Sequence, residues 1–299
     1  MNLLQLIQTT AQELQLPVPA TVIGNLDLQV TQLLALLNAL GYELQREYDW
    51  QKLDTEYRLY TQYLITTGNT TQNSAVVTNL ASTAGLDTTY QVSGTGVNQD
   101  TYVKSVDSSS QVTLSQALTV TGTGATINFG KTKYAMPTDY DRQVDRTQYD
   151  KTKRWEMLGN ETAQQWQFLK SSYIATGPRI RWRMLGGFFQ IWPMVTSAEY
   201  LGFEYISANW AQDAGGNGKS SFTVDTDTSI FPDQLLITGL KKKLFESRGM
   251  DAAFFQAAYN KLLDLAKSYD GGSPTLAMAP QPSSVLVGYE NIPDTGFGY

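Results

Sequence analysis

The chain has 299 residues, of which 41% are hydrophobic and 17% are charged, and its formal net charge is −6. Because it contains neither cysteine nor histidine, it excludes disulfides, cysteine or histidine metal ligands, thiol nucleophiles and serine–histidine–aspartate triads. The acidic balance is also unlike that of a protein that grips nucleic acid through a basic surface.

The amino-terminal part of the chain predicts two helices. Residues 2–16 carry leucine and isoleucine at helical spacing, and two prolines follow them. Residues 25–49 predict a longer helix, for which Asn25 or Asp27 supplies the cap. Its apolar positions recur in steps of three and four and form one stripe suited to packing on another helix: Leu26, Val30, Leu33, Leu37, Leu40, Leu44 and Tyr48.

Residues 66–130 differ in composition from everything around them. They are rich in threonine, serine, glycine and valine, and short runs such as TYQVSG and SQVTLS alternate with turn residues. This pattern predicts a small all-β module. Because Tyr60–Leu64 and Tyr134–Pro137 look like two strands of one sheet, we predict that the module is inserted into a body made of residues 1–65 and 131–269.

Residues 131–230 return to a β-rich sequence with many aromatic residues. The runs WEMLG, RIRWRM, FFQIWP and EYLGFEYISANW predict a meander of antiparallel strands, and QQWQFLKS predicts a short helical turn. Arg179, Arg181 and Arg183 alternate, so they share one strand face, with Trp182 on the other. This basic face is a candidate contact for DNA or an acidic partner, although a solvated or inter-subunit ion-paired face is the favoured interpretation.

The carboxy-terminal part predicts a helical hairpin and a tail. The helix at 232–247 has Pro232 in its first turn and Gly249 as its terminator. The helix at 251–268 carries one apolar face, made of Phe254, Phe255, Ala258, Leu262 and Leu265. Residues 270–299 are rich in glycine, proline and serine, which predicts an extended tail that becomes ordered against a partner. The predicted fold is therefore α+β: a helical hairpin bundle with an antiparallel β-meander, an inserted all-β module and an extended carboxy-terminal tail.

Two short motifs have a functional and a structural interpretation. DAGGNGKS at 213–220 approaches a phosphate-binding loop, but Asp213 replaces its first glycine and the strand-like run SFTVD follows it. We interpret it as a hairpin turn, with a nucleotide site at Gly218–Ser220 as the alternative. DTDTS at 225–229 has carboxylates at every second position but lacks the glycine and distal glutamate of a calcium loop. We interpret it as a polar approach to the helix at Pro232, with a bound cation as the alternative.

Five segments, taken in chain order, carry a family resemblance. They are TVIGNLDLQVTQLLALLNALGYELQREYDWQKL at 21–53, YAMPTDYDRQVDRTQYDKTKRWEMLGNETAQQWQFLKS at 134–171, PRIRWRMLGGFFQIWP at 178–193, FEYISANW at 203–210 and DTDTSIFPDQLLITGLKKKLFESRGMDAAFFQAAYNKLLDLA at 225–266. In this order they resemble the head-to-tail connector proteins of tailed bacteriophages, of the tail-accessory-factor type found in short-tailed phages. The module at 66–130 departs from the simplest members and looks like a surface decoration.

The resemblance implies a structural role and no enzyme activity, cofactor or metal. Such proteins form a ring, commonly dodecameric, that lies beneath the portal in the neck of the virion, retains the genome and gives the tail a platform. The implied partners are other copies of the chain, the portal protein, a downstream tail or nozzle protein, and genomic double-stranded DNA that passes through the lumen without sequence-specific binding. In the family the carboxy-terminal segment reaches the portal, so the candidate portal-docking residues are Leu286, Val287, Tyr289, Ile292, Phe297 and Tyr299.

A tail-associated component that binds carbohydrate or degrades cell wall is the alternative function. It is motivated by the aromatic stretches at 182–210, which could stack on sugars, and by the β module. Glu13, Glu43 and Glu47 are the carboxylates whose removal would test an acid–base mechanism. The amino-terminus lacks the basic region and cleavage site of a signal peptide, and no apolar run reaches about 18 residues. We therefore expect assembly in the host cytoplasm and no membrane partner.

Overall fold

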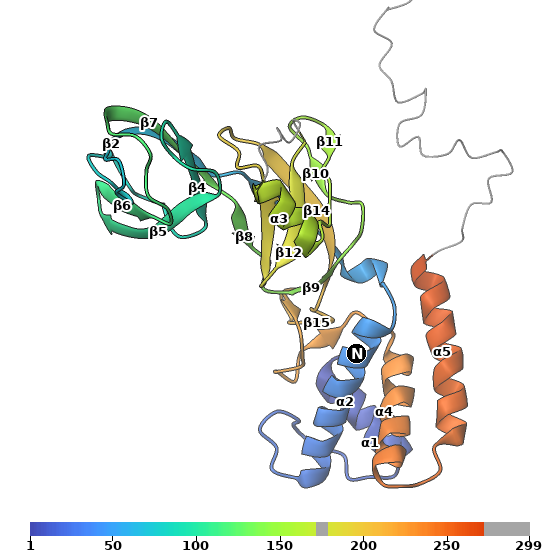
Figure 1. Ribbon diagram of the computed structural model, residues 1–299. Helices are drawn as coiled ribbons and strands as arrows, with labels where there is room; N and C mark the ends of the chain where they lie inside the picture. The colour runs from blue at the N-terminus through green and yellow to red at the C-terminus, as the bar shows by residue number, and fades with distance from the viewer. Residues whose placement is uncertain (172–178, 272–299) are drawn as a thin grey trace, which may run out of the picture.

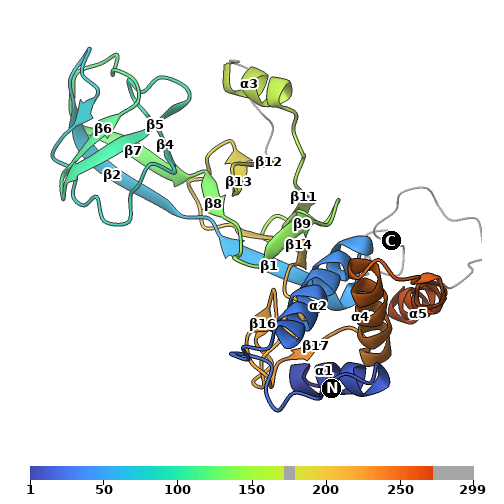
Figure 2. The ribbon, with the colours of Figure 1, turned by 90° about the horizontal axis from the view of Figure 1, so that it is seen from below.

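The computed structural model describes residues 1–171 and 179–271. Its helices and sheets follow one another along an elongated molecule (Figure 1). Helices lie at one end, small sheets lie in the middle, and a β module lies at the other end (Figures 1 and 2). The described residues contain five α-helices, and the strands of every sheet pair antiparallel. The mixed α+β class that the sequence predicts is therefore confirmed.

Four of the helices pack around a shared apolar core. They are α1 (Leu3–Glu13), α2 (Leu28–Glu47), α4 (Asp233–Ser247) and α5 (Ala253–Gly271). Helix α4 lies in the centre, because it contacts α1, α2 and α5. Leucines from α2 and α4 fill the space between the helices, and both Leu40 and Leu240 are completely buried. These interlocked leucines stabilise the helical region chiefly by removing apolar surface from water.

The ends of the helices follow the signals in the sequence, with one exception. Asp27 caps α2 by accepting a hydrogen bond from the Gln29 N–H at 2.9 Å, as expected for one of the two candidate caps. Gly249 takes a φ of +67° after α4, as expected for a helix terminator. The prediction that Leu26 belongs to the buried stripe of α2 is wrong. Leu26 precedes the Asp27 cap, so it lies outside the helix and is 94% exposed.

Helix α2 approaches the β region at Gly41, which lies against the buried indole of Trp210. A β-carbon at position 41 would lie only 2.3 Å from ring carbons of Trp210. We expect Gly41→Val to lower the free energy of unfolding by about 3 kcal/mol, because helix and indole must separate. Urea denaturation measures this change. Ala39→Val, on the exposed face of the same helix, is the matched control and should cost less than about 1 kcal/mol; an equal loss in both variants would contradict the close approach.

The middle of the molecule contains three small sheets and a short helix. One sheet joins β1 (Asp54–Tyr60), β9 (Tyr140–Gln143), β10 (Tyr149–Asp150), β11 (Trp155–Glu156) and β14 (Tyr200–Ser207). A second has the order β12 (Arg181–Leu185), β13 (Phe188–Trp192) and β8 (Lys133–Ala135), and a third has the order β16 (Gly218–Lys219), β15 (Ala211–Gln212) and β17 (Thr228–Ser229). The 3-10 helix η1 (Gln51–Leu53) precedes β1, and α3 (Ala163–Ser171) follows β11.

The predicted meander across residues 131–230 is therefore wrong as a topology. Strand β14 pairs with the whole of β1, which precedes the module in the sequence, and also pairs with β9 and β10. Strands β12 and β13 do form an expected hairpin, where Gly186 and Gly187 both take positive φ values. The segment QQWQFLKS forms α3, as predicted.

The module forms a six-stranded sheet that is almost a closed barrel. Its order is β2 (Tyr63–Thr70), β7 (Gly122–Lys131), β4 (Tyr90–Gly94), β5 (Thr101–Ser108), β6 (Gln111–Leu114) and β3 (Val76–Val77). Two backbone hydrogen bonds between Asn69 and Thr78, at 2.7 and 3.1 Å, join the first strand to the end of the last. Val103, Ile127 and Phe129 are buried inside, so the module has its own apolar core.

The interpretation of Tyr60–Leu64 and Tyr134–Pro137 as two strands of one sheet is wrong. Tyr60 ends β1, whereas Tyr63 begins β2 of the module, and β8 belongs to the sheet with β13. Thr61 separates β1 from β2, since its N–H and hydroxyl donate to the carbonyls of Glu199 and Ser197. The module therefore begins a few residues before the predicted boundary.

Candidate functional site

The outer face of α5 carries an apolar stripe that no other described segment covers. Helix α5 packs on α4 through the buried residues Tyr259, Leu263 and Ala266. Burial beside these helices raises the pKa of Tyr259 to about 12. The neighbouring face presents Phe254, which is 79% exposed, Tyr269, which is 78% exposed, together with Ala258 and Leu265. We call these four residues the α5 stripe.

The structure divides the predicted apolar face of this helix. The sequence places Phe254, Phe255, Ala258, Leu262 and Leu265 on one apolar face. In the structure Phe255 is half-buried and contacts the ring of Phe245, with centroids 4.8 Å apart, whereas Phe254 and Leu265 face outward. Tyr259 and Ala266, which the prediction omitted, make the buried contacts instead.

A second apolar surface lies on the other side of α4, in the connection between α1 and α2 (Figures 1 and 2). Leu26 and Leu28 are among the most exposed large apolar side chains of the described chain, and Val18 and Ile23 nearby are also exposed. We call these four residues the α1–α2 patch. Exposed leucines scattered singly are ordinary, but two apolar surfaces on opposite sides of one small helical region are typical of a protein that is covered by neighbours.

Ion pairs between helices occupy the glutamates and lysines of this region. Lys243 pairs with Glu43 at 2.6 Å, Lys267 pairs with Glu47 at 3.1 Å, and Lys241 pairs with Glu13. The three carboxylates that we considered for acid–base catalysis are thus each held beside a different lysine.

The predicted basic strand face is only partly a strand face. Arg179 is exposed and precedes β12. The Arg181 guanidinium lies 2.6 Å from the Glu161 carboxylate, and Arg183 lies over the Trp166 ring, 4.6 Å from its centroid. Burial lowers the pKa of Arg183. Glu161, in the loop before α3, and Trp166, in α3, are thus the neighbours of Arg181 and Arg183. A contact of this basic face with DNA or an acidic partner stays a prediction.

The segment DAGGNGKS forms a hairpin turn, as predicted. Strand β15 pairs with β16 across it, and the Asp213 carboxylate accepts hydrogen bonds from the backbone N–H groups of Gly215 and Asn217. The side-chain amide of Asn217 donates to the same carboxylate, and this bond together with the backbone bonds lowers the pKa of Asp213. The Lys219 ammonium does not face an open phosphate-binding loop. It forms an ion pair with the buried Asp227 carboxylate at 2.9 Å.

The segment DTDTS forms hydrogen bonds with the amino-terminal region. The prediction that it serves as a polar approach to α4 is wrong. The Asp225 carboxylate accepts the N–H groups of Val22 and Ile23, and its carbonyl accepts that of Leu4. The Asp227 carbonyl accepts the N–H of Leu3. Within the described ranges, no group of three or more acidic side chains is placed to hold a metal ion. The two aspartates therefore hold α1 and the connection that follows it.

The aromatic stretch at 182–210 contributes four large rings to the core. Trp182, Phe189, Phe203 and Trp210 are all buried, and Phe189 contacts the rings of both Trp182 and Phe203. These rings are therefore closed to sugars.

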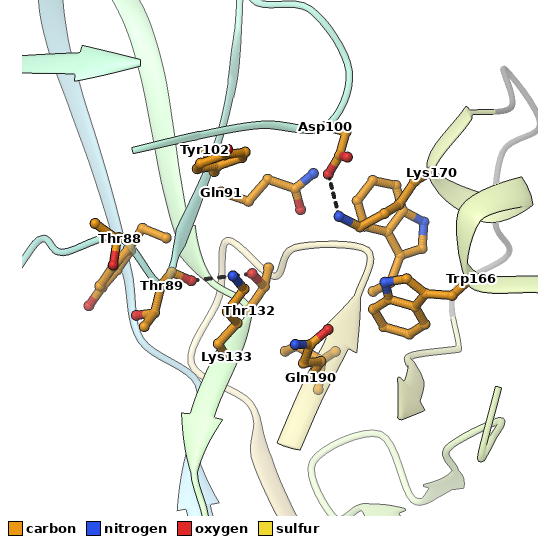
Figure 3. Close-up of a pocket in the computed structure, with 13 residues that line it drawn as sticks. Thr88, Thr89, Gln91, Asp100, Tyr102, Thr132, Lys133, Trp166, Lys170 and Gln190 are labelled. Carbon is orange, nitrogen blue, oxygen red and sulfur yellow. Dashed lines mark hydrogen bonds and ion pairs between the residues drawn. The ribbon is translucent and has the colours of Figure 1, made fainter. Parts of the chain in front are cut away.

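A cavity of about 190 Å³ with a mixed polar and aromatic lining lies where the module meets the body (Figure 3). Strands β4 and β5 of the module, strands β8 and β13 of the body, and helix α3 contribute to its wall. Lys170 of α3 crosses the junction and pairs with Asp100 of the module at 2.7 Å. No local pattern in the sequence predicts this site, because its residues come from segments that are far apart along the chain.

The described residues include no helix whose length and apolar character would let it cross a membrane. The predicted portal-docking residues Leu286, Val287, Tyr289, Ile292, Phe297 and Tyr299 lie outside the described part of the chain. In comparisons with known proteins, no family model matches the chain and no curated protein matches it.

Proposed function

We propose that this chain is the structural subunit of a ring that joins the DNA-filled capsid of a tailed bacteriophage to its tail, beneath the portal protein. The observation that carries the proposal is the pair of apolar surfaces, the α5 stripe and the α1–α2 patch, on opposite sides of α4. The order of the sequence segments that resemble connector proteins supports the particular class.

Two different surfaces on opposite sides of one subunit favour a head-to-tail contact. When the α5 stripe of one copy packs on the α1–α2 patch of the next copy, every subunit contacts one neighbour through its stripe and the other neighbour through its patch. Such a heterologous contact repeats from copy to copy and forms a closed ring where the rotation between subunits closes. Burial of Phe254, Tyr269 and Leu26 in each contact contributes about 25 cal/mol for each Å² removed from water.

The remaining parts of the chain supply the axial contacts of the proposed ring. In the proposed ring, the helical hairpin bundle forms the wall. The tail at 270–299 extends to the portal, and its apolar residues bind there. The downstream tail or nozzle protein lies on the opposite side of the ring, and genomic DNA passes through the lumen without sequence-specific contacts. The barrel module projects away from the helical region in Figure 1, as expected for a surface decoration.

Co-assembly with the portal protein tests this function directly. We expect the full chain, mixed with purified portal, to form a ring on the portal that is visible by electron microscopy, because repeated weak contacts around a ring reinforce one another. A chain that ends at residue 271 is the matched control, and it should bind the portal far more weakly. If the full chain fails to associate with the portal under every condition that keeps both proteins folded, the connector function is wrong.

A further inference from the structure

Strand β1 forms one border of its sheet, and its edge on the side away from β14 is open. It pairs with β14 over seven consecutive residues without a bulge, and it ends the strand order of the sheet. No other helix or strand of the described residues runs along it. Its sequence, DTEYRLY, contains no proline, and all of its residues except Tyr57 and Leu59 are exposed.

The alternation of hydrogen bonds in an antiparallel sheet shows which backbone groups of β1 face this open edge. On β14, the carbonyls of Tyr200 and Glu204 accept hydrogen bonds from segments on the side opposite to β1. The odd-numbered residues of β14 therefore bond to the odd-numbered residues of β1, Tyr57 among them. The N–H and C=O groups of Glu56 and Arg58 consequently point into the open edge.

The other sheet borders within the described ranges are short or covered. Strands β8, β9, β11, β16 and β17 have at most four residues each. Leu158 exchanges hydrogen bonds with the segment that begins β12, and the barrel closes between Asn69 and Thr78. An unpaired edge is a template for another strand, which proteins usually shorten, bulge or cover. Since β1 shows none of these protections, its edge favours pairing with a further strand.

The sequence of β1 is complementary to itself when two copies run antiparallel. If Tyr57 lies opposite Tyr57 of the second copy, all seven residues pair, and Glu56 of each copy lies opposite Arg58 of the other. Because Glu56 and Arg58 carry the outward groups, each of these pairs exchanges both of its backbone hydrogen bonds. Opposite charges directly across a strand pair stabilise it, whereas a register centred on Glu56 or on Arg58 places like charges opposite each other.

We propose that β1 pairs with β1 of a second copy across a two-fold axis, so that the two sheets continue into one. This contact differs from the head-to-tail contact of the ring, which uses the helical region and relates neighbours by a rotation around the ring. The β1 dimer is therefore a form of the unassembled chain, and it does not rest on the connector function. Because the contact is small, we expect a dissociation constant of about 0.1 mM, so dilute chain remains monomeric.

Sedimentation equilibrium across this concentration range tests the dimer, with Phe254→Asp and Leu265→Asp present in every chain to remove the proposed ring contact. Glu56→Arg makes both outward charges of β1 positive, and Arg58→Glu makes both negative. Each variant alone should dimerise about tenfold more weakly. A mixture of the two should form a mixed dimer at least as tight as the dimer with unchanged β1, because every arginine then lies opposite a glutamate.

Asp264→Arg is the matched control, because it changes the net charge by the same amount at an exposed position on α5. It should leave the dimer unchanged. Amide hydrogen exchange reports the strand pairing itself. The N–H groups of Glu56 and Arg58 should become protected as the dimer forms, whereas the N–H of Tyr57 is already bonded to β14. Thermal unfolding of each variant shows that a loss of the dimer is not a loss of fold.

Four results would overturn the inference. They are a chain with unchanged β1 that stays monomeric well above the expected dissociation constant, dimers that survive in both single variants, a mixture that does not associate, and Glu56 and Arg58 amides that stay unprotected in the dimer. Since ring assembly takes no part in this measurement, its outcome is separate from that of co-assembly with the portal.

Discussion

Replacing Asp227 with alanine should lower the free energy of unfolding by about 3–5 kcal/mol. The carboxylate is completely buried, and it accepts hydrogen bonds from the backbone N–H groups of Thr223 and Val224 at 2.7 and 2.9 Å. It also pairs with Lys219 at 2.9 Å. Alanine leaves the partly buried backbone N–H groups of Thr223 and Val224 without their acceptor, and it leaves the Lys219 ammonium with the Thr223 hydroxyl alone. A loss of this size is a large part of the 5–15 kcal/mol that stabilises an ordinary domain, so α1 should also detach from the loop that holds it.

Chemical denaturation followed by circular dichroism measures this loss, and hydrogen exchange at Leu3 and Leu4 reports the release of α1. Asp264→Ala is the control, because it removes an exposed carboxylate from α5 and should change stability by less than about 0.5 kcal/mol. A similar small change for Asp227→Ala would show that the loop at 223–228 does not depend on the carboxylate.

The same group gives the stability a dependence on pH. Burial by itself raises the pKa of Asp227, but the hydrogen bonds from Lys219, Thr223 and Val224 outweigh burial, and the pKa lies below its ordinary value. The folded state therefore gains stability from the charged form above the ordinary aspartate pKa, and it loses this contribution as the pH falls through the lower folded pKa. Asp227→Asn should consequently flatten the acid side of the stability profile.

Charges on the α5 stripe should abolish ring formation while the subunit remains folded. We expect the double variant Phe254→Asp and Leu265→Asp to remain a monomer under conditions in which the unchanged chain assembles, because two carboxylates cannot be buried in an apolar contact without partners. Its melting temperature should change little, since both side chains are exposed in the isolated subunit. Analytical ultracentrifugation measures the assembly.

A substitution in the α1–α2 patch and a substitution on the barrel are the comparisons for this experiment. Leu26→Asp, in the α1–α2 patch, should cause the same loss of assembly, because the proposed contact joins the two surfaces. Ile65→Asp is the control, since Ile65 is also exposed, lies on the barrel and takes no part in the helical region. Assembly that survives in the double variant, or that is lost equally in Ile65→Asp, would contradict the head-to-tail contact.

The sequence predicts the helices well because their signals are local. Asp27 and Gly249 mark helix ends through their own backbone chemistry, and the leucines of α2 from Leu33 to Leu44 recur with the helical period. The same period does not determine the orientation of α5. Periodicity identifies residues that share a face, but whether Phe254 meets another helix of the same chain or lies at the surface depends on where α4 is placed.

The sheets and the cavity depend on contacts between distant segments, and the sequence could not supply them. Alternating residues in β1 and β14 show that each is a strand, yet nothing local pairs Tyr57 with Phe203. The cavity is a stronger case, since Asp100, Trp166 and Gln190 become neighbours only when the barrel, α3 and β13 are in place.

The chain enters and leaves the barrel at one point. Tyr63 pairs with Gly130, and the Lys131 N–H donates to the Gln62 carbonyl at 2.8 Å, so the two crossings lie side by side. Because the two ends of the module are adjacent, its coding sequence can be gained, lost or exchanged as one piece. The positions of β1 and β8 then remain unchanged. The junction is thus a place where such a protein can acquire or replace a surface domain during evolution, and the natural position for grafting a foreign domain of similar geometry.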